Sequence, residues 1–156
     1  MLSVKIVCVG KLKEAYWRAA VEEYAKRLSA LCRLEITELP EARLPAAPTP
    51  GEIAAALEKE SAAILPRLSG TVYPLCIEGR ALDSPGMARL LERAMESPGA
   101  VSFVIGSSFG LGDAVKQAGR GISMSAMTFP HQLARVMLCE QIYRGMQILR
   151  GAPYHK

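Results

Sequence analysis

A glycine-rich turn between Gly106 and Gly112 is the first segment whose residues could form a ligand site. It reads Gly-Ser-Ser-Phe-Gly-Leu-Gly and directly follows Val101 to Ile105, a run that predicts a strand. In open α/β sheets, ligands bind at the carboxyl ends of the strands. The turn lacks the Lys-Ser/Thr pair of a triphosphate loop, and its glycines do not match G-x-G-x-x-G. They indicate close backbone approach, either to an uncharged ligand or within a merely tight turn.

A second candidate segment, Ile122 to His131, reads I-S-M-S-A-M-T-F-P-H and consists largely of small residues. The pattern predicts a short strand that turns into a loop and then reaches a helix. Backbone amides and carbonyls in such a loop are free to contact an adenine edge and a ribose. At the probable start of the helix, we expect His131 to cap or pack rather than to bind a metal.

The tail from Arg150 to Lys156 carries groups that could move a proton or stabilise an anion. His155 is a candidate base, and Arg150 or the upstream Arg144 could stabilise negative charge. An ordered terminus or phosphate contacts would explain Tyr154 and His155 equally well. The chain has only two histidines and no C-x-x-C motif, so we expect no metal site.

Positive charge is concentrated towards the C-terminus. Residues 1–113 contain 13 Lys/Arg against 14 Asp/Glu, a net charge of −1, whereas residues 114–156 contain 6 against 1, a net charge of +5. Such a field favours a polyanionic partner, because neutralising phosphates releases counterions. A solvated surface with a few spare cations is the alternative.

The elements that position these segments alternate between strand and helix. Strands are predicted at Val4–Val9, Leu34–Leu39, Thr71–Ile77 and Val101–Ile105, the first and last of them from apolar runs. Helical spacing or composition predicts helices at Glu14–Leu31, Glu52–Leu65, Pro85–Glu96 and His131–Arg150. Pro74 indicates an edge position or an irregular end in the third strand. The alternation predicts a parallel α/β sheet, and the 156 residues suffice for one core, hence a single domain over 1–156.

The last predicted helix is apolar nearly all round, which in a chain of this size favours burial against a second subunit. Glu140 and Arg144 are four residues apart and should form a structural salt bridge. No apolar run approaches the length of a membrane span. The four cysteines stand singly in apolar stretches, so we expect buried, reduced thiols in a cytoplasmic protein.

The run V-I-G-S-S-F-G-L-G and the C-terminal stretch from T-F-P-H to P-Y-H-K resemble the RlmH family, the bacterial 23S rRNA pseudouridine N3-methyltransferases of the SPOUT superfamily. The similarity extends over the whole chain. It implies helices on both faces of the sheet, a C-terminal trefoil knot over approximately residues 101–156, and a homodimer whose knots meet. It also implies that S-adenosylmethionine is the cofactor and that 23S rRNA in the assembled ribosome is the substrate.

Matched by motif, the resemblance also assigns cofactor-contacting residues. They are Leu75, Gly106, and the loop residues Met124, Ser125, Ala126, Met127, Thr128 and Phe129. Leu75 alone would otherwise be assigned to the core. Family members usually read I-G-G at the turn, whereas Ser107 and Ser108 follow Gly106 here, a change that would tighten or reshape that wall of the pocket. The remaining glycines argue against lost activity.

The chemistry that the resemblance implies is modest. The acceptor nitrogen must be aligned with the methyl group of the sulfonium, and its imide proton must leave. We expect the tail with Tyr154 to close over the acceptor uridine, with His155 as candidate base and Arg144 or Arg150 as anion stabiliser. A non-catalytic RNA-binding module of the same fold and a nucleotide-binding metabolic enzyme are the alternatives.

Overall fold

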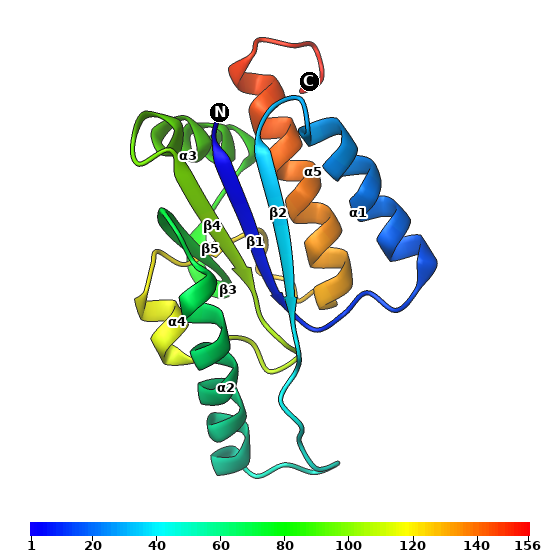
Figure 1. The fold of residues 1–156 in the computed structure, drawn as a ribbon, viewed down its shortest axis with the longest axis vertical. Coiled ribbons are helices and arrows are strands. Elements are labelled where there is room, and N and C mark those ends of the chain that lie inside the picture. The colour runs from blue at the N-terminus through cyan, green and yellow to red at the C-terminus, as the bar shows by residue number, and fades with distance from the viewer.

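Five parallel strands in the order β2-β1-β4-β3-β5 form the framework of the protein (Figure 1). The computed structural model describes residues 1–156. The strands are β1 (Ser3–Val9), β2 (Arg33–Leu39), β3 (Thr71–Ala81), β4 (Ala100–Ile105) and β5 (Ile122–Ser123). Because all pairs are parallel, the carboxyl ends of β1, β2 and β4 meet at one edge of the sheet. The predicted parallel α/β architecture is confirmed.

The helices follow the predicted ranges closely. They are α1 (Ala15–Leu28), α2 (Pro50–Ile64), α3 (Ser84–Glu96), α4 (Asp113–Gln117) and α5 (His131–Leu149), with a 3₁₀ turn at Leu65–Arg67 after α2. A capping box between Thr49 and Glu52 starts α2, and the carboxylate of Asp83 accepts a 2.7 Å bond from the Gly86 amide to start α3. The short α4 was not predicted.

Alternate residues of the central strands pack against helices on opposite faces of the sheet. Ile6 of β1 and Phe103 of β4 join one buried cluster with residues of α1, α3 and α5. Val7 and Val104, their immediate neighbours, join a second cluster with residues of α2 and α4. This period of two explains why both strands are continuous apolar runs, since both of their faces are covered.

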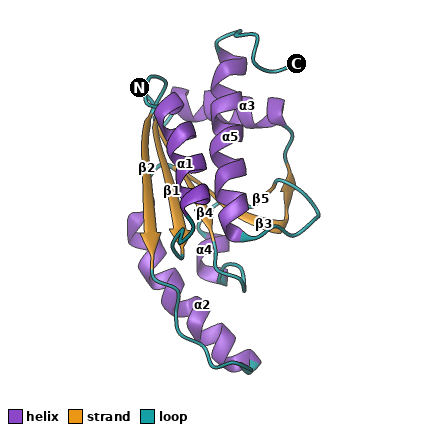
Figure 2. Cartoon of the chain, turned by 90° about the vertical axis from the view of Figure 1, so that its right-hand side faces the viewer, coloured by secondary structure: helices purple, strands orange, loops and turns teal.

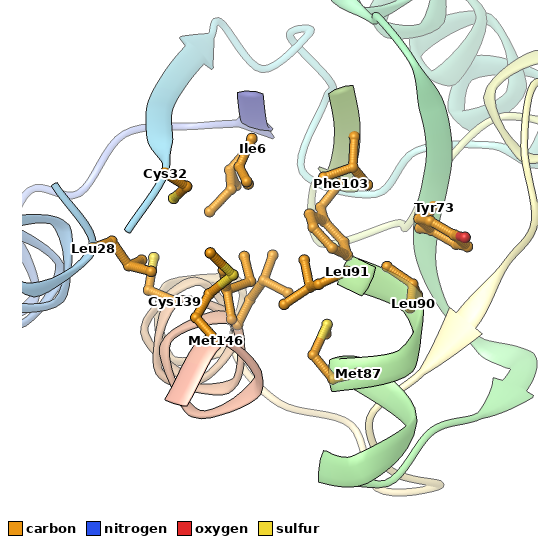
Figure 3. Packing of buried hydrophobic residues seen from close by; sticks show 14 of the residues in the cluster. Ile6, Leu28, Cys32, Tyr73, Met87, Leu90, Leu91, Phe103, Cys139 and Met146 are labelled. Carbon is orange, nitrogen blue, oxygen red and sulfur yellow. The ribbon is translucent and has the colours of Figure 1, made fainter. Parts of the chain in front are cut away.

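The C-terminal helix α5 is part of the larger core (Figure 3). Its side chains Leu138, Cys139, Ile142 and Met146 are buried in this cluster, and Cys139 lies beside Leu28 of α1 in Figure 3. Leu133, Val136 and Met137, by contrast, are only half-buried. The helix that is apolar nearly all round therefore keeps a partly uncovered apolar face. No helix of the protein is both long and apolar enough for a bilayer span.

Strand β3 changes partners at Pro74, the residue that predicted irregularity. Thr71 to Pro74 pair with β4, whereas Leu75 and then Arg80 both register with Ile122 of β5, with a shift between them. Proline has no backbone N–H to donate, so it marks a natural point for pairing to end. The strand continues to Ala81 rather than ending at Ile77, and β5, not β3, lies at the edge.

All four cysteines are free thiols. Burial raises the pKa of Cys8 and of Cys32 to about 11, and that of Cys139 to about 12. Cys76 is only half-buried, contrary to the expectation of four buried thiols, because it lies where β3 leaves β4. The three buried thiols therefore remain protonated at neutral pH and act as small core residues.

Candidate functional site

A cavity of about 860 Å³ opens at the carboxyl end of β4, next to the outer half of β3. It is bounded by the glycine-rich turn, the loop between β5 and α5, and the first turn of α5. The predicted cofactor residues that line it are Leu75, Gly106, Met124, Ser125, Met127, Thr128 and Phe129. Ala126 belongs to the same loop but lines a neighbouring groove instead. A cavity of this size suits a cofactor-sized molecule.

The glycine-rich turn is closed on itself. The amide of Gly110 donates a 2.9 Å bond to the carbonyl of Ser107, and Gly110 has a φ of +83°, which other residues adopt only with strain. A Cβ on Gly106 would collide with the Gly110 carbonyl. The turn therefore needs glycine at position 106 to keep its shape, and this shape forms one wall of the cavity.

The two serines that depart from the usual pattern connect this turn to the opposite face of the sheet. Ser107 is buried, and its hydroxyl donates a 3.0 Å bond to the carboxylate of Glu60 on α2. Glu60 also accepts a 2.9 Å bond from the Ala42 amide, and the Ser108 hydroxyl lies 3.3 Å from Glu41. The serines therefore brace the turn against α2 and the loop before it, and the cavity stays open beside them.

The loop after β5 carries its own short-range hydrogen bonds. The Ser123 hydroxyl donates to the Ser125 carbonyl at 2.9 Å, and the Met127 amide donates to the Ser125 hydroxyl at 3.0 Å. The Met127 side chain is 73% exposed, and that of Phe109, on the glycine-rich turn, is 46% exposed. Both line the cavity, so they offer uncovered apolar surface to a ligand with a flat ring.

Charge on the cavity wall is balanced. Lys116 and Glu78 form an ion pair of 2.6 Å. The hydrogen bond between them raises the pKa of Lys116 and lowers that of Glu78. Both side chains line the cavity, and they neutralise each other. The cavity is thus suited to a ligand of little net charge, and no group of three or more His, Cys, Asp or Glu side chains could hold a metal ion.

Three of the four predicted catalytic residues form one cluster at the far end of α5. Glu140 accepts bonds from Arg144 at 2.7 and 3.0 Å and from the Tyr154 hydroxyl at 3.1 Å. The guanidinium of Arg144 also lies 3.2 Å from Nδ1 of His155 and stacks over the Tyr154 ring. The predicted pair of Glu140 and Arg144 is confirmed. Arg150 is exposed and does not join the cluster.

The first turn of α5 lines the cavity, whereas the tail cluster lies towards the other end of the helix. Figures 1 and 2 show the C-terminal tail at the end of α5 opposite its first turn. His131 at the start of the helix lines the cavity. Arg144 lies roughly 20 Å further along the axis, at a rise of about 1.5 Å per residue. One chain therefore brings together the predicted cofactor residues, but it does not bring its tail to them.

Arg135 is a residue that sequence reasoning missed. It is only 2% exposed, and it donates bonds to Glu38 at the end of β2 and to the carbonyl of Gly10 just after β1. Burial opposes ionisation of Glu38, but bonds from Arg135 and the Leu12 amide outweigh it and lower its pKa. The sequence feature that could have identified Arg135 is its position as a charged residue within an otherwise apolar stretch of the predicted helix. Its contacts fix the start of α5 at the cavity edge.

Of the two roles expected for His131, capping the helix or packing, the structure shows packing. Its ring lies against Gly10, where a Cβ would meet the ring at 3.3 Å. The helix has no side-chain cap. Together with Arg135, His131 therefore anchors the first turn of α5 on the carboxyl ends of β1 and β2.

Comparisons with known proteins agree with this geometry. The family described as "Predicted SPOUT methyltransferase" matches residues 2–155. The chain is 42% identical over 159 residues to the Ribosomal RNA large subunit methyltransferase H of Ligilactobacillus salivarius (strain UCC118), covering 99% of this chain and 100% of that protein.

Two solved structures share the fold at low sequence identity. A probable methyltransferase from Bordetella pertussis Tohama I superposes with a TM-score of 0.60 at 17% identity, over 93% of this chain and 95% of that one. TrmJ from Z. mobilis ZM4 gives a TM-score of 0.55 at 15% identity, over 93% of this chain and 70% of that one. The family match and the near full-length relative carry the assignment: this chain is a methyltransferase of the SPOUT family and belongs to its RlmH group.

Proposed function

We propose that the protein transfers a methyl group from S-adenosylmethionine to N3 of a pseudouridine in 23S rRNA, acting as a homodimer on the assembled ribosome. The observation that carries the proposal is the cavity at the carboxyl end of β4, where the glycine-rich turn and the loop after β5 meet. The large-subunit rRNA methyltransferase named above is a relative over its full length, which supports the same substrate class.

The cavity fits S-adenosylmethionine in size and character. The close approach of Gly106 to Gly110 keeps the glycine-rich turn compact, so that it forms one wall of the cavity, and Leu75 and Phe129 supply apolar walls. When bound, the cofactor supplies a methyl group carried on a sulfonium. Backbone groups between Met124 and Phe129 that the short-range bonds of Ser125 leave unpaired would hold its adenosine part. We further propose that residues from about 101 to 156 form the trefoil knot that the family resemblance implies.

The separation of the tail from the cavity along α5 supports the proposed homodimer. The half-buried apolar residues Leu133, Val136 and Met137 leave a face of that helix partly uncovered. A second copy packed there would cover this face, as apolar helix surfaces require. If its tail points towards the first copy's cavity, the roughly 20 Å separation within one chain no longer matters. We therefore assign the tail of each site to the opposite subunit.

Within the tail cluster, each residue has a different proposed role. Burial and the negative charge of Glu140, which also accepts its hydrogen bond, raise the pKa of Tyr154, so its phenol stays protonated and acts as a donor. A guanidinium can only donate, so Nδ1 of His155 accepts from Arg144 and the ring proton lies on Nε2. When Arg144 turns to the acceptor's carbonyl oxygen, Nδ1 becomes free to take the N3 proton. Arg150 would then contact the neighbouring backbone phosphate.

The test is methyl transfer to large ribosomal subunits from a strain that lacks the gene. We expect the purified protein and S-adenosylmethionine to add one methyl group to a pseudouridine, as seen by mass spectrometry of the nucleosides. An unchanged modification profile would contradict the proposal. Absence of S-adenosylmethionine binding in calorimetry, together with ribosome binding, would favour the non-catalytic module instead.

A further inference from the structure

Next to the cofactor cavity lies a second groove, of about 670 Å³, whose lining contains four arginines. They come from three parts of the fold: Arg80 from the outer half of β3, Arg89 and Arg93 from α3, and Arg120 from the segment before β5. All four side chains are exposed. Folding thus gathers residues that lie up to 40 positions apart in the sequence into one basic surface, which we call the arginine groove.

The positive charge of the arginine groove is largely unbalanced. Asp83 is the one acidic residue in its lining, and its carboxylate lies 3.9 Å from Arg89 while also capping α3. Arg80, Arg93 and Arg120 form no ion pair and no side-chain hydrogen bond. Arg89 and Arg93 are four apart on one helix, where like charges are destabilising. An anionic partner would offset this repulsion.

The groove and the cofactor cavity share a wall. Ile122 and Ser123 of β5 and the following Met124 and Ser125 line both. An RNA strand whose acceptor nucleotide reaches the cavity would therefore pass directly over this wall into the groove. Arginine suits such a path, because its planar guanidinium binds phosphate oxygens in a bidentate manner.

We infer that the arginine groove binds the phosphodiester backbone of the RNA strand next to the acceptor nucleotide. The inference rests on the proposed function and adds to it the surface that grips the substrate. A strand with several phosphates fits better than a single nucleotide, since the four arginines come from three separate elements along the groove. The groove would position the RNA without reading its sequence.

The test compares two double variants of exposed arginines. Arg93→Gln/Arg120→Gln removes two unpaired charges from the groove, and Arg43→Gln/Arg67→Gln removes two from the loop before α2 and the turn after it. We expect the groove variant to raise KM for unmodified large ribosomal subunits by about tenfold or more, with kcat and S-adenosylmethionine affinity unchanged. Its log–log salt dependence should weaken by about one for each arginine removed.

A groove variant with the KM and salt dependence of the control variant would overturn the inference, and so would loss of S-adenosylmethionine affinity. Should the wild-type protein transfer no methyl group, the proposed function fails on its own. The groove is then judged by binding of a fluorescent single-stranded oligoribonucleotide. Weaker binding by the groove variant than by the control supports the groove, and equal binding overturns it.

Discussion

The two ends of α5 differ in how much of the candidate site a single chain supplies. At its first turn, Arg135 and His131 fix the helix to β1 and β2, and the cavity beside it is closed by residues of one chain. In its second half, Glu140 holds Arg144 and Tyr154 in a cluster that takes no part in lining the cavity at the first turn. Under the proposed function, this difference means that a single chain supplies the whole cofactor site, whereas methyl transfer uses the tail of a second copy.

Removing the tail should have the largest effect. Deletion of Tyr154 to Lys156 takes away the candidate proton acceptor and the hydrogen bond to Glu140. We expect methyl transfer to fall by about 10²-fold or more, the range of general acid–base catalysis. Affinity for S-adenosylmethionine, measured by calorimetry, should stay unchanged because the cavity is intact. A truncated protein with full activity would remove the tail from the mechanism.

Changing the glycine-rich turn should lower the affinity for S-adenosylmethionine, which the tail deletion leaves unchanged. In Gly106→Ala, the new methyl group collides with the Gly110 carbonyl and displaces the cavity wall. We expect S-adenosylmethionine affinity to fall by about tenfold or more, equivalent to at least ~1.4 kcal/mol. Gly51→Ala is the matched control, since a Cβ there meets only the Thr49 hydroxyl at 4.0 Å. Unaltered cofactor affinity in Gly106→Ala would place the ligand elsewhere.

Breaking the anchor of α5 should lower stability rather than chemistry. Arg135→Met leaves Glu38 without its buried partner, and we expect a loss of about 2 kcal/mol in the free energy of unfolding at pH 7. The pKa of Glu38 is lowered in the folded state, so its contribution is present above the ordinary value of 4.5 and is lost as pH falls through the lowered pKa.

Urea unfolding of wild type and Arg135→Met at neutral and at acidic pH measures this dependence. The difference in unfolding free energy between the two proteins should become smaller at acidic pH, because a protonated Glu38 no longer forms an ion pair with Arg135. A difference that is constant with pH would show that packing of the side chain, and not the ion pair, is what Arg135 contributes.

The smallest expected effect comes from removing the hydrogen bond between Ser107 and Glu60. Ser107→Gly removes the bond to Glu60, which keeps its bond from the Ala42 amide. We expect a loss of about 1 kcal/mol of stability and little change in S-adenosylmethionine affinity. Ser108→Gly serves as comparison, because its 3.3 Å contact with Glu41 is exposed and should contribute little. A large loss of affinity in Ser107→Gly would mean that this hydrogen bond shapes the cofactor pocket directly.

Local patterns predicted most of the fold. The predicted ranges of β1, β2 and β4 agree with the structure to within one residue at each end. The residues of β1 and β4 are mostly buried, which explains their apolar runs, whereas the edge strand β2 is partly exposed. The five residues of α4 are too few for a helical period to register, and β3 extends past Ile77 through polar residues that pair with β5. The extension of β3 therefore depends on tertiary pairing, which local sequence patterns do not encode.

The candidate site was also predictable only in part, because sequence motifs identify segments but not the residues that folding brings next to them. Motifs identified the turn and the loop that line the cavity, but the charge count missed the arginine groove. Arg80, Arg89 and Arg93 belong to residues 1–113, whose net charge is −1, and folding places them in one groove whose lining has Asp83 as its single acidic residue. The distance between tail and cavity, by contrast, follows from the length of α5 alone.

The central claim, that each site combines one chain's cavity with the other chain's tail, can be tested by mixing two variants. Each is inactive on its own when the S-adenosylmethionine concentration is kept well below the Kd of Gly106→Ala. Gly106→Ala keeps its tail, and the protein lacking Tyr154 to Lys156 keeps its cavity. After joint refolding in equal amounts, half of the dimers are mixed and each contains one complete site, so we predict about a quarter of wild-type methyl transfer. Activity no higher than that of the separate variants would contradict the claim, because it would mean that the tail serves its own chain.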